Sequence, residues 1–472
     1  MSRTTTTTRS DRLEGGEAKS SWLLVENDSH CHFHPIAVEG GQIPMENPMS
    51  KHPSLPRPNA GELKLENSQR LLADARRLVP GVTMTMMKRP EMFAPGAFPV
   101  FLARGQGALV EDVDGQQYID YVCGLGANSL GHNHPAVLQA IRQHLEEGLL
   151  HSLPTPVEVT ASRALVEATP GAEMVRFFKT GADATSAAVR LARFITRKDR
   201  IITVGYNGWH DHFMYDTPGV PSAVAEYTRR LPLFEEPEEA ALLARVEQDA
   251  GQLAAVLLSV PFNRALNREF LHQLRAACTK HGVMMILDEV ITGLRLARGG
   301  AQEFYDVKAD FVCLSKAIAA GMPLSAVAGP AQYLSKLSEL QVSTTFGGEM
   351  LSLAVCEAVL REYRENDHIG HMMSLGRRLR EGINARSERL GSRLQVLGYD
   401  GIPLFRFSKD LAENAKLTQP FQAGMARRGV LLRRDLNFLS PAHTVEQIDY
   451  TIDMVEETLR ENAQRAAGSN AA

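Results

Sequence analysis

The sequence contains few cysteines, no long apolar run and no excess of one charge. Only five of its 472 residues are cysteines, and they lack the paired spacing of a metal site or a disulfide framework. The formal net charge is −4 with acids and bases interspersed, so no basic stripe indicates nucleic acid or a membrane surface. The apolar stretches fall far short of the roughly 20 residues that cross a bilayer. We therefore expect no metal, no nucleic-acid partner and no membrane partner.

The beginning of the sequence differs from the rest. Residues 1–60 contain a threonine run and a proline-rich stretch with few periodic apolar positions, which predicts a disordered N-terminal extension. The cluster His30, Cys31, His32 and His34 has metal-binding side chains, but a mobile segment without a second ligand cluster is not expected to hold a metal. No apolar segment typical of a secretory signal is present, so the sequence predicts a cytoplasmic location.

Strands and helices alternate over residues 157–328. Helical stretches such as residues 185–196 and 267–281 separate six apolar strand patterns, at residues 175–179, 200–204, 254–260, 283–288, 311–315 and 325–329. This alternation predicts an α/β fold whose mainly parallel sheet is covered by helices on both faces. Ligands of such folds bind at the carboxyl ends of the strands.

The flanking segments predict a smaller second domain. Short strands are expected at residues 100–103 and 108–112, before a turn at Asp114-Gly115. Beyond residue 367 the pattern changes to long helices with short strands, typical of an α+β domain. We therefore expect an extension (1–60), an N-terminal segment that contributes to the small domain and active site (61–120), a large cofactor-binding domain (121–366), a C-terminal small domain (367–465) and a flexible tail (466–472).

Two chemically active side chains follow buried strands. Lys316 comes directly after the apolar run 311–315, and Asp288 ends the apolar run 283–288. At one edge of a sheet, a lysine can hold the aldehyde of pyridoxal phosphate as a Schiff base, while an aspartate keeps the ring nitrogen protonated. The pair predicts pyridoxal phosphate chemistry. Lys316 would also move protons, because burial lowers the pKa of a lysine.

Two loops could complete this site. Thr180, Gly181 and Ala182 join an expected strand to a helix, and the free amides of a helix N-terminus suit a phosphate group. A tight turn with a capping residue is the alternative. Trp209 follows the next strand, where it either stacks on a flat ring or fills a surface cleft. His210 either contacts the ring or phosphate, or hydrogen-bonds to loop backbone.

The order of these motifs resembles that of a known enzyme family. Further matching segments are Glu173-Met174-Val175-Arg176-Phe177, Asp288-Glu289-Val290-Ile291-Thr292-Gly293 and Gly299-Gly300-Ala301-Gln302-Glu303. Over residues 63–459 the chain is similar to the class III pyridoxal-phosphate-dependent aminotransferases, close to aminotransferases of the glutamate semialdehyde aminomutase type. The resemblance implies fold-type I, with a seven-stranded sheet in the large domain, and a homodimer whose active sites lie at the subunit interface.

The resemblance also implies roles for individual residues. Lys316 would be the Schiff-base lysine and Asp288 the pyridinium partner, with Val290 on the ring face opposite Trp209. Asn263 would lie near the ring hydroxyl. A further implied contact is that of Thr345, which would reach the phosphate from the neighbouring subunit.

Departures from the aminomutase pattern concern the substrate. Where the aminomutase has a carboxylate-binding arginine, this chain has Met87, followed by Lys88 and Arg89. The segment after Trp209 is also shorter than the lid of the aminomutase. Incomplete closure of the active site favours transfer of the amino group between two molecules over its shift within one molecule. The remaining substrate-side candidates are Arg295, Arg433, Arg434 and Asp435.

We therefore predict an aminotransferase that moves an amino group from a small-molecule amino donor to a ketone or aldehyde acceptor. Three alternatives stay open: an aminomutase of the glutamate semialdehyde type, an amino acid racemase or epimerase, and a cofactor-binding protein without turnover. The sequence names neither donor nor acceptor, because small changes in pocket loops alter specificity by large factors.

Overall fold

The computed structural model describes residues 55–56 and 63–469. The predicted extension over residues 1–60, with its histidine cluster at 30–34, therefore lies almost entirely outside the described residues. Residues 470–472 also lie outside. The last helix is α13 (Val445–Ser469). It includes residues 466–469, which belong to the segment predicted as a flexible tail.

A mainly parallel sheet of seven strands forms the centre of the fold, as predicted. Its order is β4-β10-β9-β8-β7-β5-β6, and β10 runs antiparallel to both neighbours. The bounds are β4 (Met174–Phe178), β5 (Arg200–Val204), β6 (Thr228–Leu231), β7 (Leu253–Ser259), β8 (Met284–Asp288), β9 (Phe311–Leu314) and β10 (Ser325–Gly329). Only β6 was missed, because this edge strand is largely polar.

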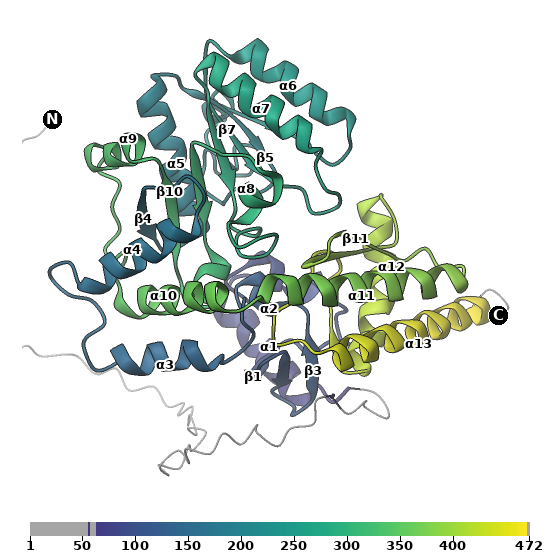
Figure 1. Ribbon diagram of the computed structural model, residues 1–472. Coiled ribbons are helices and arrows are strands. Elements are labelled where there is room, and N and C mark those ends of the chain that lie inside the picture. The colour runs from purple at the N-terminus through teal and green to yellow at the C-terminus, as the bar shows by residue number, and fades with distance from the viewer. Residues whose placement is uncertain (1–54, 57–62, 470–472) are drawn as a thin grey trace, which may run out of the picture. The chain divides into compact units, whose positions relative to one another are not determined.

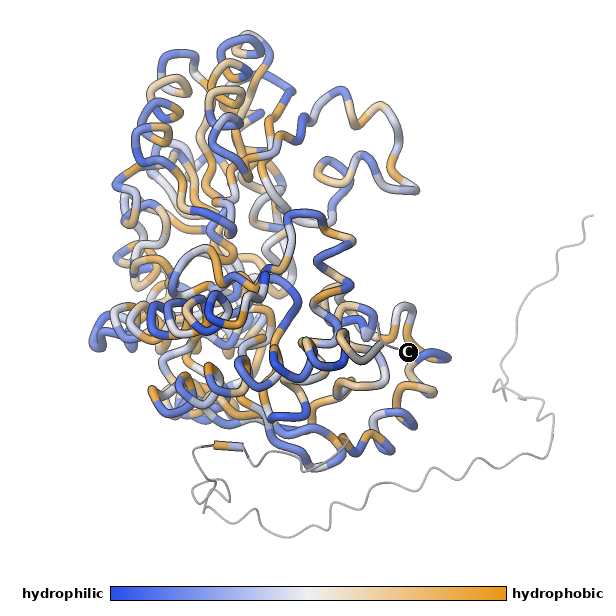
Figure 2. The backbone as a smooth tube through the Cα atoms, turned by 90° about the vertical axis from the view of Figure 1, so that its right-hand side faces the viewer, coloured by the Kyte–Doolittle hydropathy of each residue, from blue (hydrophilic) through white to orange (hydrophobic). Residues whose placement is uncertain are grey.

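Helices cover both faces of this sheet. In β7, Ala255 and Leu257 pack in the same apolar cluster as α5 (Gly181–Thr196), whereas Val256 and Leu258 pack with α6 (Pro237–Asp249) and α7 (Arg268–His281). Figure 1 shows α6 and α7 together over one end of the sheet. A strand buried on both faces reads as a continuous apolar run. Figure 2 shows hydrophobic and hydrophilic colour alternating along the helices at the outside of the fold.

A small sheet joins the two ends of the folded chain. Its strands are β1 (Leu102–Gln106), β2 (Leu109–Asp112), β3 (Gln117–Asp120) and β13 (Val430–Leu431). β13 pairs in parallel with β3, so the C-terminal part contributes one strand to a sheet made from the N-terminal segment. The rest of the C-terminal part is α11 (His368–Arg389), α12 (Leu411–Arg427), α13 and the hairpin β11 (Gln395–Tyr399) and β12 (Ile402–Arg406).

The remaining elements are short helices and connecting helices. They are α1 (Glu66–Leu78), η2 (Met86–Lys88), η3 (Pro90–Met92), α2 (Cys123–Gly126), α3 (Pro135–His144), α4 (Pro156–Ala168), η4 (Ser222–Glu226), α8 (Gly300–Tyr305), η5 (Lys316–Ala319), α9 (Ala331–Leu334), η6 (Ser335–Glu339) and α10 (Met350–Glu365). Within the described ranges, no helix is long and apolar enough to cross a membrane. The four described cysteines are free and buried.

Candidate active site

A pocket of about 300 Å³ lies at the carboxyl ends of the parallel strands, where the fold predicts a ligand. Lys316 follows β9, Asp288 ends β8, and the Thr180–Gly181 turn follows β4; all of them line the pocket. Asn207 and Trp209 reach it from the loop after β5. Residues that are far apart in the sequence thus meet because their strands are neighbours.

Lys316 occupies a strained backbone position. It begins η5 with a φ of 45°, a left-handed conformation that costs a non-glycine residue on the order of 1–3 kcal/mol. Hydrogen bonds on both sides hold the turn: the Ser315 hydroxyl donates to the Leu324 carbonyl at 2.8 Å, and the Ser129 hydroxyl donates to the Ala317 carbonyl at 2.7 Å. These hydrogen bonds therefore hold the strained turn and fix where the Lys316 amine enters the pocket.

The environment of Lys316 favours a neutral amine. Burial lowers the pKa of Lys316 to about 8, against the opposing effect of the Asp288 carboxylate. The positive charges of Arg295 and Arg433 lower this pKa as well. At neutral pH a useful fraction of the amine is therefore unprotonated and able to act as a nucleophile or base.

Asp288 is buried and held by three hydrogen bonds. Its Oδ2 accepts from Asn207 Nδ2 at 2.8 Å and from the Ser259 hydroxyl at 2.9 Å, and its Oδ1 accepts from the Val290 amide at 3.1 Å. Burial raises the pKa of Asp288, and the bond from Asn207 is the largest of the effects that counter this rise. With both lone pairs of Oδ2 engaged, Oδ1 keeps one free acceptor position for a ring N–H.

Asn207 and Ser259 were not predicted as site residues. Each is a polar residue at or just beyond the carboxyl end of an apolar strand, β5 for Asn207 and β7 for Ser259. A polar residue at this end of an apolar strand is the signal in the sequence that could have identified both. Asn207 is inconspicuous beside Trp209, and Ser259 lies within residues 254–260, which read as one buried apolar run.

The neighbouring acid Glu289 has a structural role. Its carboxylate accepts hydrogen bonds from the amides of Ala301 at 2.7 Å and Gln302 at 3.0 Å, and from the Thr292 hydroxyl at 2.8 Å. It therefore caps the start of α8 and closes the loop that follows Asp288. Of two adjacent buried acids, only Asp288 lines the pocket.

The start of α5 has the geometry of a turn that can bind an anion. Thr180 is the N-cap, and the Asp183 carboxylate turns back to accept from the Thr180 amide at 2.8 Å, so it is engaged in the cap. The amides of Gly181 and Ala182 lie in the first turn, where an α-helix offers no internal acceptor. A Cβ at Gly181 would lie 3.0 Å from the Val290 side chain, so glycine keeps this space open.

Trp209 stands at the mouth of the pocket with 69% of its surface exposed. His210 packs edge-on against it at 5.0 Å between ring centroids. The Nδ1 of His210 lies 2.6 Å from the hydroxyl of Ser186 in α5. His210 therefore anchors the loop to α5, through a side chain rather than the backbone partner considered from the sequence, and is not among the pocket-lining residues.

Two cofactor-side candidates lie outside the lining of this pocket. Asn263 donates to the Phe234 carbonyl at 2.9 Å and secures the loop after β7. Thr345 is exposed in the segment before α10. Its predicted contact belongs to a neighbouring subunit, so that role stays a prediction.

The substrate-side candidates also lie apart from the pocket lining. Lys88 lines a second cavity of about 510 Å³, and Arg89 packs over Gly81. Arg295 is buried and donates to the carbonyls of Leu439 at 2.8 Å and Gly126 at 2.7 Å, so it ties segments together. Of the remaining three candidates, Arg433 and Asp435 pair with each other, since Arg433 Nη2 lies 2.9 Å from Asp435 Oδ1, and Arg434 is half-buried beside them.

These residues fit pyridoxal phosphate. The pocket combines a perturbed lysine, a buried carboxylate with one free acceptor position, a helix N-terminus and an aromatic side chain. When bound, the cofactor supplies an aldehyde and a ring that accepts electrons. Lys316, Asp288, the amides of Gly181 and Ala182, and Trp209 are the groups that would hold it.

Comparison with known proteins decides the family. The profile of the family described as Aminotransferase class-III matches residues 92–456. The chain belongs to the class III aminotransferases. Glutamate-1-semialdehyde 2,1-aminomutase of Syntrophobacter fumaroxidans is 34% identical over 420 residues, which cover 82% of this chain and 96% of that protein. Seven further curated relatives at 30–35% identity have the same name.

Solved structures agree with the fold. The PLP form of the FumI protein of Sphingopyxis sp. MTA144 has a TM-score of 0.79 at 26% identity, covering 85% of this chain and 97% of that one. An omega-transaminase from Sphaerobacter thermophilus has a TM-score of 0.74 at 25% identity, covering 83% and 97%. As a class III aminotransferase, this protein therefore uses pyridoxal phosphate as its cofactor, as predicted from the sequence.

Proposed function

We propose that this class III enzyme is an aminotransferase acting on two separate substrates, an amino donor and a ketone or aldehyde acceptor. The observation that carries this proposal is the short segment after the pocket-lining Trp209, which leaves the pocket without a long lid from its own chain. Only residues 210–221 separate Trp209 from η4, and within the single subunit Tyr206 and Trp209 are exposed, at 65% and 69%. An open site lets one product leave and a second substrate enter, whereas an internal shift requires the reacting molecule to stay.

The side chains divide the work as follows. Lys316 Nζ, neutral in part near pH 7, would accept the proton from the donor carbon and pass it to the bound cofactor. In the second half-reaction the same amine would carry a proton from the cofactor to the acceptor carbon. Asp288, oriented by Asn207 and Ser259, holds the ring nitrogen in its protonated form. The amides at the start of α5 fix the phosphate end. The loop 82–89 lacks the carboxylate-binding arginine that the resemblance places at Met87, which leaves the substrate class open.

An aminomutase is the second candidate, and the comparisons favour it. Every curated relative reported above has the name of glutamate-1-semialdehyde 2,1-aminomutase, at 30–35% identity over most of the chain. The two solved structures reported above do not decide the matter, although one is described as a transaminase. A racemase or epimerase is the weaker third reading.

A single-substrate experiment separates these functions. We expect one amino donor alone to convert the bound cofactor to its amine form in one half-reaction, seen in the visible spectrum, and a carbonyl acceptor to restart the reaction. Conversion of glutamate-1-semialdehyde alone through many turnovers would establish the aminomutase instead. Sustained inversion of a single amino acid would establish the racemase. A panel of donors then identifies the substrate class.

We further propose a homodimer with active sites at the subunit interface. Its support is a group of exposed apolar side chains near Thr345, namely Leu149, Leu153, Val159 and Phe346. The Leu149 carbonyl accepts from the amide of the first residue of α10, so the segments that carry these side chains are joined. Light scattering on the purified protein tests the dimer. The cytoplasmic location stays a prediction.

A further inference from the structure

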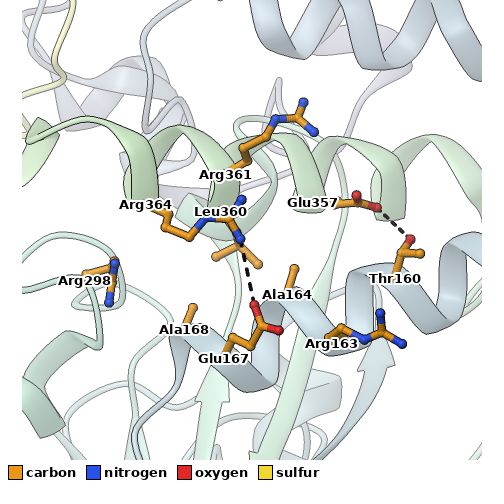
Figure 3. Close-up of a pocket in the computed structure, with 10 residues that line it drawn as sticks. All are labelled: Thr160, Arg163, Ala164, Glu167, Ala168, Arg298, Glu357, Leu360, Arg361 and Arg364. Atoms are coloured by element: carbon orange, nitrogen blue, oxygen red, sulfur yellow. Dashed lines mark hydrogen bonds and ion pairs between the residues drawn. The ribbon is translucent and has the colours of Figure 1, made fainter.

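A positively charged groove, distinct from both cavities described above, lies between α4 and α10. It has a volume of about 290 Å³ and shares no lining residue with the pocket around Lys316. Figure 3 shows side chains of both helices around it, with one more arginine from the loop before α8. The arginines are Arg163, Arg298, Arg361 and Arg364.

The charges around this groove are not balanced. Four guanidinium groups and two carboxylates, those of Glu167 and Glu357, belong to its lining, which leaves a net charge of +2 at neutral pH. One carboxylate is already engaged, because Glu357 accepts from the Thr160 hydroxyl at 2.6 Å. The other carboxylate, that of Glu167, makes only a long ion pair, with its Oε2 3.9 Å from Arg364 Nη1. Arg364 also pairs with Glu365, whose Oε1 lies 3.4 Å from Arg364 Nη2.

Three of the arginines have no ion-pair partner among the described residues. Among the residues that the structure describes, no carboxylate lies within 4.0 Å of the guanidinium nitrogens of Arg163, Arg298 or Arg361. Like charges that share a groove repel one another, and a bound anion would remove that repulsion.

We propose that this groove binds a small anion with two or more negative charges carried by phosphate or carboxylate groups. A guanidinium plane matches the paired oxygens of either group. The groove is at the lower limit of roughly 300–1,000 Å³ typical of small-molecule sites, which suits an anion of the size of pyrophosphate or a short dicarboxylate. Ala164, Ala168 and Leu360 form a floor of small and apolar side chains that leaves this room.

Calorimetric titration of the holoenzyme tests the site. With the cofactor bound, its phosphate site is filled and does not compete, and no turnover is needed. We expect pyrophosphate, succinate or both to bind at low salt and to bind more weakly as sodium chloride rises, since the guanidinium groups are exposed. Arg163→Gln and Arg298→Gln should each weaken binding by about fivefold.

Arg142→Gln is the matched control, because Arg142 is an exposed arginine of α3 outside the groove. Binding of pyrophosphate alone would assign phosphate ligands, and binding of succinate alone would assign carboxylates. The proposal fails if neither anion binds. It also fails if the groove variants lower the affinity no more than Arg142→Gln does, with all variants melting at the temperature of the parent protein.

Discussion

The lowered pKa of Lys316 leads to a quantitative prediction for cofactor capture. Because the neutral amine is the nucleophile, the rate at which cofactor-free protein reacts with pyridoxal phosphate should rise with pH to a midpoint near 8. The shift from 10.5 to about 8 makes the neutral amine roughly 300-fold more abundant, relative to the charged form, than in an unperturbed lysine. Visible absorbance after rapid mixing measures the rate, and Nα-acetyl-lysine, whose side-chain amine is free, is the unperturbed reference.

Two variants should move this midpoint in opposite directions. The Asp288 carboxylate raises the pKa of Lys316, so Asp288→Asn should lower the midpoint below that of the parent protein. Arg433 lowers the same pKa, so Arg433→Gln should raise it. A parent midpoint near that of N-acetyl-lysine would refute the argument from burial. Shifts of both variants in the same direction would refute the argument from charge.

Three further substitutions test the site. Lys316→Ala should abolish turnover and leave the cofactor noncovalently bound, so that borohydride reduction adds cofactor mass to the parent protein only. Asn207→Ala removes the 2.8 Å hydrogen bond to Asp288 and should weaken cofactor binding roughly tenfold or more in a fluorescence titration. Gly208→Ala places a Cβ 2.7 Å from α5 at a φ of 124° and should destabilise the protein by about 1–3 kcal/mol in thermal or urea unfolding.

Each of these has a control. Retained turnover in Lys316→Ala would remove the lysine from the mechanism. Asn207→Asp keeps the shape but places a second acid beside Asp288, so it should bind the cofactor no better than Asn207→Ala; parent-like affinity in both would dismiss Asn207. Gly251→Ala meets open space and should be neutral, so equal effects at Gly208 and Gly251 would contradict the steric argument.

The strands that carry the site were predictable because both of their faces are buried. β7, β8 and β9 read as uninterrupted apolar runs, and the polar residues at their ends mark the edge where a ligand binds. Lys316 and Asp288 were found in this way. β1 was placed two residues early because its side chains are mostly exposed and lack alternation.

Contacts between side chains were less accessible from the sequence. The side-chain hydrogen bonds that orient Asp288 come from the loop after β5 and from the last residue of β7, and nothing in the spacing of Asn207 and Ser259 links them to Asp288. Arg295 shows the reverse case. It was a substrate-side candidate, but its guanidinium donates to backbone carbonyls of distant segments, which only the folded chain brings together.

The pairing of β3 with β13 delays folding during synthesis. Ile119 and Val430 are register partners about 310 residues apart. At roughly 5–20 residues per second, a ribosome needs roughly 15 to 60 s to make the intervening chain. Throughout that interval the nascent hairpin exposes an unpaired strand edge. The small sheet is therefore expected to stay incomplete until Val430 has been made.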